Sequence, residues 1–458
     1  MLNINWKLNI LQQRFKNITK ILQKLLTFDK KYNILKNEKY ILKKMEELSL
    51  AIGDIIVGID IGTSKITTVV GEVNNFNQIE TVCMSKAKCI GMKKAKIINE
   101  NEVAMSIAKT INDAEEEANL RINSAYVTIP GKYVTIVQNS VVKDIKDKFA
   151  GISIKDVNSA LMLVKDIELP DNKTIIDIVP EQFILDDGKI VTDPVGALSE
   201  NFTVNAEIIL ADKDYIKQLH QIFKKVDLEI DGIVPVTLAE RNVVLDANEL
   251  NDHIMLLDIG AGNTEIGIFN GNKFTYTNTI PLGGESITND IALVLDISSE
   301  EAERLKRQYG LALKSFIDND NDIILNTCNG LSKTRTIKSS ELIEIIEARI
   351  EEIFSLINKD ITTNGTKANI NNVILTGQGI TNINKSDVAG KIALNIPVKM
   401  STGRLISTIR PSYRTAYALV RYIAARPFAK SVSSSIDTVL EDNFLKVLIG
   451  RIKEFFYS

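Results

Sequence analysis

Two segments far apart in the chain combine an aspartate with glycine and small polar residues in the same order. The first reads DIGTSK from Asp60 to Lys65, and the second reads DIGAGNT from Asp258 to Thr264. Glycine lets backbone N–H groups approach a phosphate closely, and a nearby carboxylate can hold a hydrated Mg²⁺ against phosphate oxygens. We therefore predict one phosphate-binding site built from both segments, in which Asp60 and Asp258 hold Mg²⁺ through water.

Apolar runs rich in β-branched residues flank both segments, within Ile55–Val73 and His253–Gly271. This pattern predicts a strand, a tight turn and an antiparallel strand. Because the hairpin occurs twice, we expect a duplicated domain with a cleft between the copies. A third segment, NVILTGQGITNI at Asn372–Ile383, could place a purine against a glycine turn, although an ordinary strand-to-helix turn has the same pattern. The chain has no G-x-x-x-x-G-K-[ST] loop, which argues against a P-loop enzyme.

Length and composition indicate a globular protein of more than one domain. The chain has 458 residues, of which 45% are hydrophobic and 25% charged, with a net charge of −3. These values support two domains with separate cores and give no overall attraction to nucleic acid, which we do not expect as a partner. No apolar run approaches the ~20 residues of a spanning helix. Three cysteines without CxxC spacing and only two histidines argue against a zinc site and against a disulfide framework, and reduced thiols fit a cytosol.

The two ends of the chain differ from the rest in composition. Residues 1–44 carry eleven Lys or Arg against Asp29 and Glu38, a balance of +9, with apolar residues at heptad spacing. Two interpretations stay open: a basic amphipathic helix for membrane binding or self-association, or a start assigned too early, with Met45 as the native start. An apolar signal-peptide core and cleavage site are missing from this stretch.

The C-terminal end predicts a membrane-binding helix behind a polar tether. Residues 427–442 form a Ser-rich linker, and residues 443–458 follow it. An apolar helical face with basic residues on the opposite side suits an anionic lipid interface, while a helix docked on its own protein is the common alternative. The residues of the predicted membrane face are Phe444, Leu445, Leu448, Ile449, Ile452, Phe455 and Phe456.

The order of DIGTSK, DIGAGNTEIGIF and ILTGQG resembles the actin-type ATPase superfamily, and five further segments resemble one bacterial cell-division family, FtsA. They are SAYVTIPGKYV from Ser124, VPEQFILDDGKIVTDPVGALSENFTVNAEIILAD from Val179, IPLGGESITNDIA from Ile280, EEAERLKRQYG from Glu300 and NFLKVLIGRIKEFF from Asn443. The similarity covers Ile55 to the end. It implies an α/β, actin-like two-domain ATPase fold with an FtsA-type inserted α/β subdomain in domain one, a flexible tether and a C-terminal amphipathic helix.

The resemblance also implies the organisation of the chain. We expect domain one in two parts followed by a return segment, with the insert between the parts. The expected boundaries are 51–131 and 212–252 for domain one, 132–211 for the insert, 253–397 for domain two with a smaller subdomain at about 297–342, and 398–426 for the return to domain one.

Roles at the nucleotide site follow from the same resemblance, with ATP and Mg²⁺ as the implied ligands. Two phosphate loops, a ribose-side segment, a helix beside the nucleoside and an adenosine pocket are implied. Their residues are Asp60, Gly62, Thr63, Ser64 and Lys65; Asp258, Gly260, Gly262, Asn263 and Thr264; Gly283 and Gly284; Glu303 and Lys306; and Gly377, Gln378 and Gly379. Gln378 stands where the family usually has a second glycine, so it could narrow the pocket or hydrogen-bond the nucleotide.

Hydrolysis should be slow. Related chaperones and filament proteins place a glutamate directly before a proline of the connecting helix, whereas this chain has Val234 before Pro235. An apolar side chain cannot orient a water molecule. Glu240 and Glu265 could take that role, but nothing in the sequence selects either of them.

The resemblance implies an ATP-binding protein that forms filaments, binds the C-terminal peptide of the division protein FtsZ and helps recruit other division proteins. It would act peripherally, on the cytoplasmic face of the inner membrane at the division site. The peptide would bind the smaller subdomain, around Ile297–Leu342. A PilM-like assembly scaffold, which lacks the terminal helix, and a phosphotransferase of the same superfamily, which needs a carboxylate base, are the alternatives.

Overall fold

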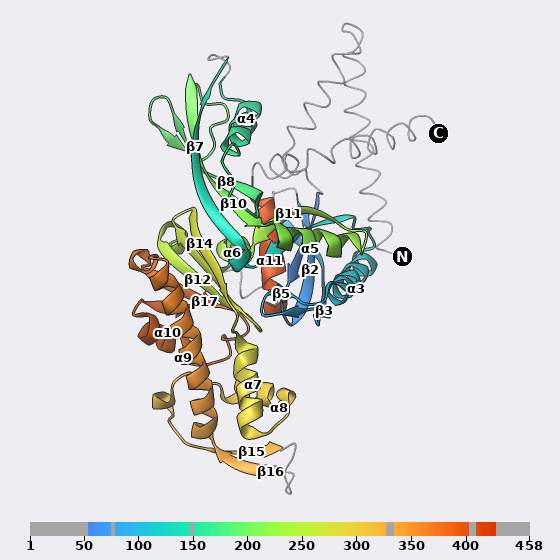
Figure 1. Ribbon diagram of the computed structural model, residues 1–458, viewed down its shortest axis with the longest axis vertical. Helices are drawn as coiled ribbons and strands as arrows, with labels where there is room; N and C mark the ends of the chain where they lie inside the picture. The colour runs from blue at the N-terminus through green and yellow to red at the C-terminus, as the bar shows by residue number, and fades with distance from the viewer. Residues whose placement is uncertain (1–53, 75–77, 147–150, 327–333, 403–408, 427–458) are drawn as a thin grey trace, which may run out of the picture. The chain divides into compact units, whose positions relative to one another are not determined.

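A computed structural model describes residues 54–74, 78–146, 151–326, 334–402 and 409–426 (Figure 1). The basic extension with Met45 and the predicted tether and membrane-binding helix lie outside these residues, so the predictions for them stay predictions. Of the helices that are described, none is long and apolar enough to cross a bilayer.

Two five-stranded sheets share one topology. In each, three antiparallel strands are followed by two that join in parallel, in the orders β3-β2-β1-β6-β11 and β14-β13-β12-β17-β18. The strands of the first sheet are β1 (Ile55–Ile61), β2 (Lys65–Val73), β3 (Ile79–Lys88), β6 (Ser124–Ile129) and β11 (Glu229–Pro235). Those of the second are β12 (His253–Ile259), β13 (Thr264–Asn270), β14 (Lys273–Ile280), β17 (Asn372–Thr376) and β18 (Val398–Met400).

The two predicted hairpins are confirmed, and they occupy the same place in their sheets. β1 pairs with β2 so that Asp60 lies opposite Thr67, and β12 pairs with β13 so that Asp258 lies opposite Glu265. Each aspartate is therefore the second-last residue of its strand, next to the tight turn. β-branched residues such as Ile59 are fully buried, which explains why both faces of the hairpins are apolar.

Helices cover the first sheet, and one of them returns from the end of the described chain. They are α3 (Glu100–Ala118), α5 (Lys213–Lys224), α6 (Val236–Val244) and α11 (Arg414–Ala424), with the small hairpin β4 (Met92–Lys93) and β5 (Lys96–Ile97) beside α3. α3 begins at Glu100 because the Asn99 side chain caps it, accepting hydrogen bonds from the amides of Asn101 and Glu102. α11 packs on β1, β2 and α6, which places its first turn next to the hairpin tips.

An inserted subdomain separates β6 from α5. Its sheet has the order β7-β10-β8-β9, and α4 packs on β7 and β10 (Figure 1). The elements are β7 (Val134–Asp144), α4 (Ile154–Val164), β8 (Lys173–Leu185), β9 (Ile190–Val191) and β10 (Asn201–Asp212). Val157 and Leu161 of α4 are buried against Phe183 and Phe202, so the subdomain has its own core.

The second sheet packs against helices that continue into a smaller group of elements. They are α7 (Gly284–Leu295), α8 (Ser299–Tyr309), α9 (Ser339–Thr363) and α10 (Ser386–Leu394), with the strand pair β15 (Asp322–Asn326) and β16 (Thr334–Lys338). The core joins Leu257 and Leu375 of the sheet to Ile291 of α7 and Phe354 of α9, all fully buried. The end of β12 and the beginning of α7 are therefore fixed by one packed core.

A buried carboxylate lies in the insert without a partner. Glu207 of β10 is fully buried, and neither of its oxygens hydrogen-bonds to another residue in the described part of the chain. Burial, with a further contribution from Glu181, raises the pKa of Glu207 from 4.5 to about 8. The folded protein therefore binds more protons than the unfolded chain between these values, and Glu207 lowers stability as the pH rises toward 8.

We expect Glu207→Gln to be more stable than the unchanged protein at about pH 9, by a few kcal/mol, and to differ little at about pH 5. Melting temperatures measured at both pH values test this. Glu168→Gln, at an exposed position of the same subdomain, controls for the loss of one charge. Equal melting temperatures of Glu207→Gln and the unchanged protein at pH 9 would show that the carboxylate finds a partner when ionised.

Candidate functional site

The tips of the two hairpins meet at a cavity of about 490 Å³. Most residues predicted to bind nucleotide line it, although they come from five separate segments of the chain. These are Asp60, Gly62, Thr63, Ser64, Lys65, Asp258, Gly260, Asn263, Gly284, Glu303, Lys306, Gln378 and Gly379.

Four predicted residues are not part of the cavity wall. Gly262 lies against Thr63, and Thr264 is fully buried and donates a hydrogen bond to the Leu282 carbonyl. Gly283 and Gly377 approach neighbouring backbone and lie behind the cavity lining. The structure therefore gives these four positions a packing role around the site.

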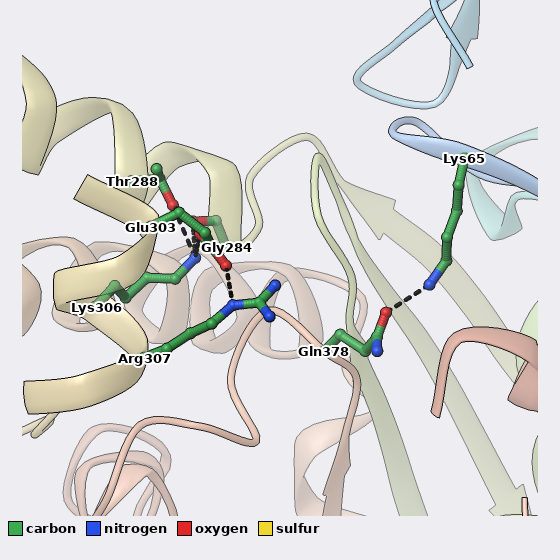
Figure 2. A network of polar contacts seen from close by, with 7 residues as sticks. All are labelled: Lys65, Gly284, Thr288, Glu303, Lys306, Arg307 and Gln378. Carbon is green, nitrogen blue, oxygen red and sulfur yellow. Dashed lines mark hydrogen bonds and ion pairs between the residues drawn. The ribbon is translucent and has the colours of Figure 1, made fainter. Parts of the chain in front are cut away.

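Direct contacts join the two halves of the site. The Thr63 hydroxyl donates to Oδ1 of Asn263 at 3.1 Å, which links the two hairpin tips. Lys65 Nζ donates to Oε1 of Gln378 at 2.5 Å, a contact visible in Figure 2. Gln378 thus reaches the first phosphate loop through a side chain that a glycine at this position would lack.

Backbone donors are available at both turns. The amides of Gly62 and Gly260 close their own turns by donating to Lys65 O and Asn263 O. Within the described residues, the amides of Thr63, Ser64 and Ala261 donate no hydrogen bond, and all three residues line the cavity. Unpaired N–H groups at a tight turn form a concave anion site, so each tip can donate hydrogen bonds to a phosphate oxygen.

The glycines of three segments pack backbone against backbone. Gly379 N donates to Ile259 O at 2.8 Å, and Gly284 N donates to Gly260 O at 2.9 Å. A Cβ built on Gly379 would lie 2.2 Å from Gly260 O and 2.8 Å from Gly284 N. Gly377 has a φ of +103°, which side-chain-bearing residues rarely adopt. These glycines are required by close packing of the loops, independently of any ligand.

A polar network holds α8 against the beginning of α7 (Figure 2). Lys306 Nζ lies 2.6 Å from Oε2 of Glu303 and donates to Thr288 Oγ1 at 2.8 Å and Gly284 O at 2.9 Å. These contacts use all three N–H donors of the ammonium group, which is almost fully buried. Lys306 therefore positions the two helices. Arg307 donates a hydrogen bond to Glu303 at 2.7 Å, and its guanidinium group is exposed on the same side of the cavity.

The two predicted metal-binding aspartates have different environments. Oδ1 of Asp60 accepts a hydrogen bond from Thr128 at 2.8 Å, and Oδ1 of Asp258 accepts one from Arg414 at 2.8 Å. Burial, and then the charge of Asp258, raise the pKa of Asp60. No group of three His, Cys, Asp or Glu side chains in the described part could hold a metal ion by itself. The donor set fits a hydrated Mg²⁺ that is held jointly by carboxylates and a phosphate chain.

Both glutamates considered for hydrolysis are engaged elsewhere. Glu265 lines the cavity but accepts hydrogen bonds from Gly131 N at 2.8 Å, Thr279 Oγ1 at 2.8 Å and Asn263 Nδ2 at 2.6 Å. Burial raises its pKa to about 7, against the effect of these donors. Glu240 of α6 is fully buried outside the cavity lining, and Val234 is buried in β11.

Three cavity residues were not predicted as site residues. Thr128 is the second-last residue of β6 and Thr288 lies in α7, both within segments that carry the family resemblance, and Arg414 begins α11. Their side chains reach the site only because parallel pairing of β1 with β6 and the return of α11 bring distant segments together. A run such as PSYRT, which opens α11, contains no local feature that distinguishes it from a surface helix start.

The duplicated sheet and the cavity at its hairpin tips define the actin-like two-domain α/β fold. A solved chain of the PilM–PilN type IV pilus biogenesis complex shares this fold with a TM-score of 0.51 at 15% identity, over 81% of this chain and 98% of that chain.

Sequence comparison goes further. The family model described as Cell division protein FtsA matches residues 255–418, and the SHS2 domain inserted in FTSA matches residues 131–210. The chain is 30% identical to Cell division protein FtsA of Bacillus subtilis (strain 168), over 81% of this chain and 83% of that protein. It is 27% identical to Cell division protein FtsA of Pseudomonas aeruginosa, over 88% of this chain and 98% of that protein. The chain belongs to the FtsA family of cell-division proteins.

We expect Gly379→Ala to lower the free energy of unfolding by about 1–3 kcal/mol, because its Cβ would collide with backbone atoms that cannot rotate away. Gly260→Ala is the matched control: there the Cβ would lie 3.2 Å from its nearest neighbour, Asn263 O, so the loss should be much smaller. Chemical denaturation of both variants tests the difference. Equal losses would contradict the packing role assigned to Gly379.

Proposed function

We propose that this protein binds ATP with Mg²⁺, assembles into filaments and tethers the FtsZ ring to the cytoplasmic face of the inner membrane at the division site. Membership of the FtsA family supports the role in cell division. The observation that carries the nucleotide proposal is the cavity formed where the two Asp-Ile-Gly hairpin tips meet. Its volume lies within the range of about 300–1,000 Å³ that is usual for small-molecule sites.

The wall of the cavity suits a nucleoside triphosphate. One end presents the amides of Thr63, Ser64 and Ala261, which donate no hydrogen bond within the described residues. Lys65, Asp60 and Asp258 lie at the same end, which would hold the phosphate chain. The other end is formed by Glu303 and Arg307 and would flank the nucleoside. The contact between Lys65 and Gln378 lies between these ends, so phosphate binding would compete for the Lys65 ammonium.

The environment of the carboxylates supports slow turnover. A general base must have a free lone pair within hydrogen-bonding reach of the attacking water. Glu265 already accepts three hydrogen bonds, which hold its carboxylate in one orientation and leave a single lone-pair site on Oε1, and Glu240 is enclosed away from the cavity. ATP would then act mainly by favouring the conformation that assembles, as a ligand that binds one state better than another.

Attachment to the membrane rests on the sequence of the tail. As a helix, residues 443–458 would present an apolar face from Phe444 to Phe456 with basic residues opposite it, and behind the Ser-rich linker they would act as a reversible lipid anchor. Filament assembly would strengthen such an anchor by multivalency. The FtsZ peptide would bind the smaller subdomain, around Ile297–Leu342, and other division proteins would join the membrane-bound filament.

The two alternatives have less support. The chain in the PilM–PilN complex is 15% identical and shares the fold, whereas identity reaches 30% with a cell-division relative. A phosphotransferase needs a free carboxylate base facing its acceptor hydroxyl. The engaged state of Glu265 gives no support to that reaction.

We expect Asp60→Ala to weaken binding of Mg-ATP by about tenfold or more, because the site loses a carboxylate that would hold the hydrated ion. Titration with a fluorescent ATP analogue measures this, and a melting curve checks folding. Asp113→Ala, at an exposed position of α3, serves as the control. Unchanged affinity of a folded Asp60→Ala variant would remove Asp60 from the site.

Deletion of residues 443–458 should release the protein from anionic liposomes and leave ATP binding intact. Phe455→Glu should have nearly the same effect, because it forces a charge into the interface, whereas Lys453→Glu should lose only about 1 kcal/mol in a salt-sensitive manner. Flotation of a chain starting at Met45 tests this, since the basic residues 1–44 are then removed as a second source of binding. Continued flotation of the truncated chain would locate the anchor elsewhere and favour the PilM-like alternative.

A further inference from the structure

Arg414, the first residue of α11, lies between carboxylates from two different parts of the fold. Its Nη2 donates to Oδ1 of Asp258, at the end of β12, at 2.8 Å. Its Nε donates to Oε1 of Glu240, in α6, at 3.2 Å, and the neighbouring Thr415 hydroxyl donates to the same oxygen at 2.7 Å. The guanidinium group is thus oriented from two sides.

Burial makes this arrangement rigid. Arg414 is 8% exposed and Glu240 is fully buried, so neither side chain can exchange its partner for bulk water at low cost. Arg414 lies in the cavity wall and Glu240 lies outside it. Glu240 therefore holds the arginine from behind and does not face a ligand. A guanidinium that is fixed in this way has lost its conformational entropy before any ligand arrives.

One nitrogen of the fixed guanidinium is still available. Nη1 makes no hydrogen bond within the described part of the chain, although Nε and Nη2 are both paired. Asp60, Lys65 and Asp258 line the same cavity as Arg414, at the end assigned to the phosphate chain. A planar guanidinium with a free N–H is well suited to phosphate oxygens.

We infer that Arg414 is a nucleotide-binding residue: it neutralises Asp258 and offers Nη1 to the terminal phosphates of a nucleoside triphosphate. Nucleotide binding therefore depends less on Mg²⁺ than it would if both Asp60 and Asp258 were without a cationic partner. This inference rests on the proposed nucleotide function. At this end of the cavity Arg414 and Lys65 are the cations that face Asp60 and Asp258, and Glu265 also lines the wall. Without Arg414 the carboxylates outnumber the cations, and a polyphosphate then needs the metal to approach them.

The competing explanation is that Arg414 only links α11 to α6 and β12. That role would make the arginine important for stability, but it would not make nucleotide affinity more dependent on metal. The ratio of ATP affinities with Mg²⁺ and with excess EDTA separates the two explanations, because a general loss of structure lowers both affinities together.

The experiment measures this ratio by titration with a fluorescent ATP analogue. The main variant is Arg414→Met combined with Glu240→Gln, because removing the arginine alone would leave a buried carboxylate without a cation. We expect the ratio to rise by about tenfold or more, because metal-free ATP then meets carboxylates without a balancing cation, whereas Mg-ATP brings its own positive charge. Arg414→Lys keeps the positive charge and should hold the ratio close to that of the unchanged protein.

Two controls accompany the variants. Arg421→Met removes a different arginine of α11, which donates to the Tyr417 hydroxyl at 3.3 Å, and should keep the original ratio. Glu240→Gln alone retains Arg414 and its contact with Asp258, so its ratio should lie well below that of the double variant. A folded double variant that binds ATP with an unchanged ratio would overturn the role of Arg414 and leave the proposed function standing. Failure of the unchanged protein to bind ATP under either condition would overturn the proposed function and this inference with it.

Discussion

The site depends on the close approach of three backbone segments. The turn after β12, the beginning of α7 and the turn after β17 meet at Gly260, Gly284 and Gly379 with no side chain between them. Hydrogen bonds from Gly284 N and Gly379 N fix this contact. Residues of α7 and β12 also belong to one packed core, so this cavity wall keeps its position as long as the core of the second domain stays folded.

The contacts across the cleft are of a different kind. Thr63 with Asn263 and Lys65 with Gln378 are single polar contacts in or next to the cavity. A polar contact of this kind exchanges for contacts with water or phosphate at small net cost, whereas a packed apolar core does not. The domains are therefore built rigidly, while these two contacts across the site are ones that a charged ligand can replace.

Features that depend on residues adjacent in the sequence could be predicted from it, whereas features that depend on contacts between distant segments could not. The hairpins were predictable because strand, turn and strand are adjacent in the chain, and both Asp-Ile-Gly turns lie where that pattern indicates. The glycines were predictable as a group, but their separate roles were not, because the collision that excludes a Cβ at Gly379 involves atoms of Gly260. Arg414 could not be found for the same reason: its partners lie in β12 and α6, far away in the sequence.

Helix α11 connects the site to the inserted subdomain through its two ends. Arg414 at its beginning binds Asp258, and Arg426, just after its end, binds both carboxylate oxygens of Asp177 in β8 at 2.5 and 2.9 Å. A second connection runs from the cavity through Glu265 to Gly131 N, directly before β7. An α-helix of this length is stiff over roughly 16 Å, so a shift of its first turn must be taken up at its last. Any ligand that binds Arg414 and shifts it therefore acts on the same rigid element that holds the insert.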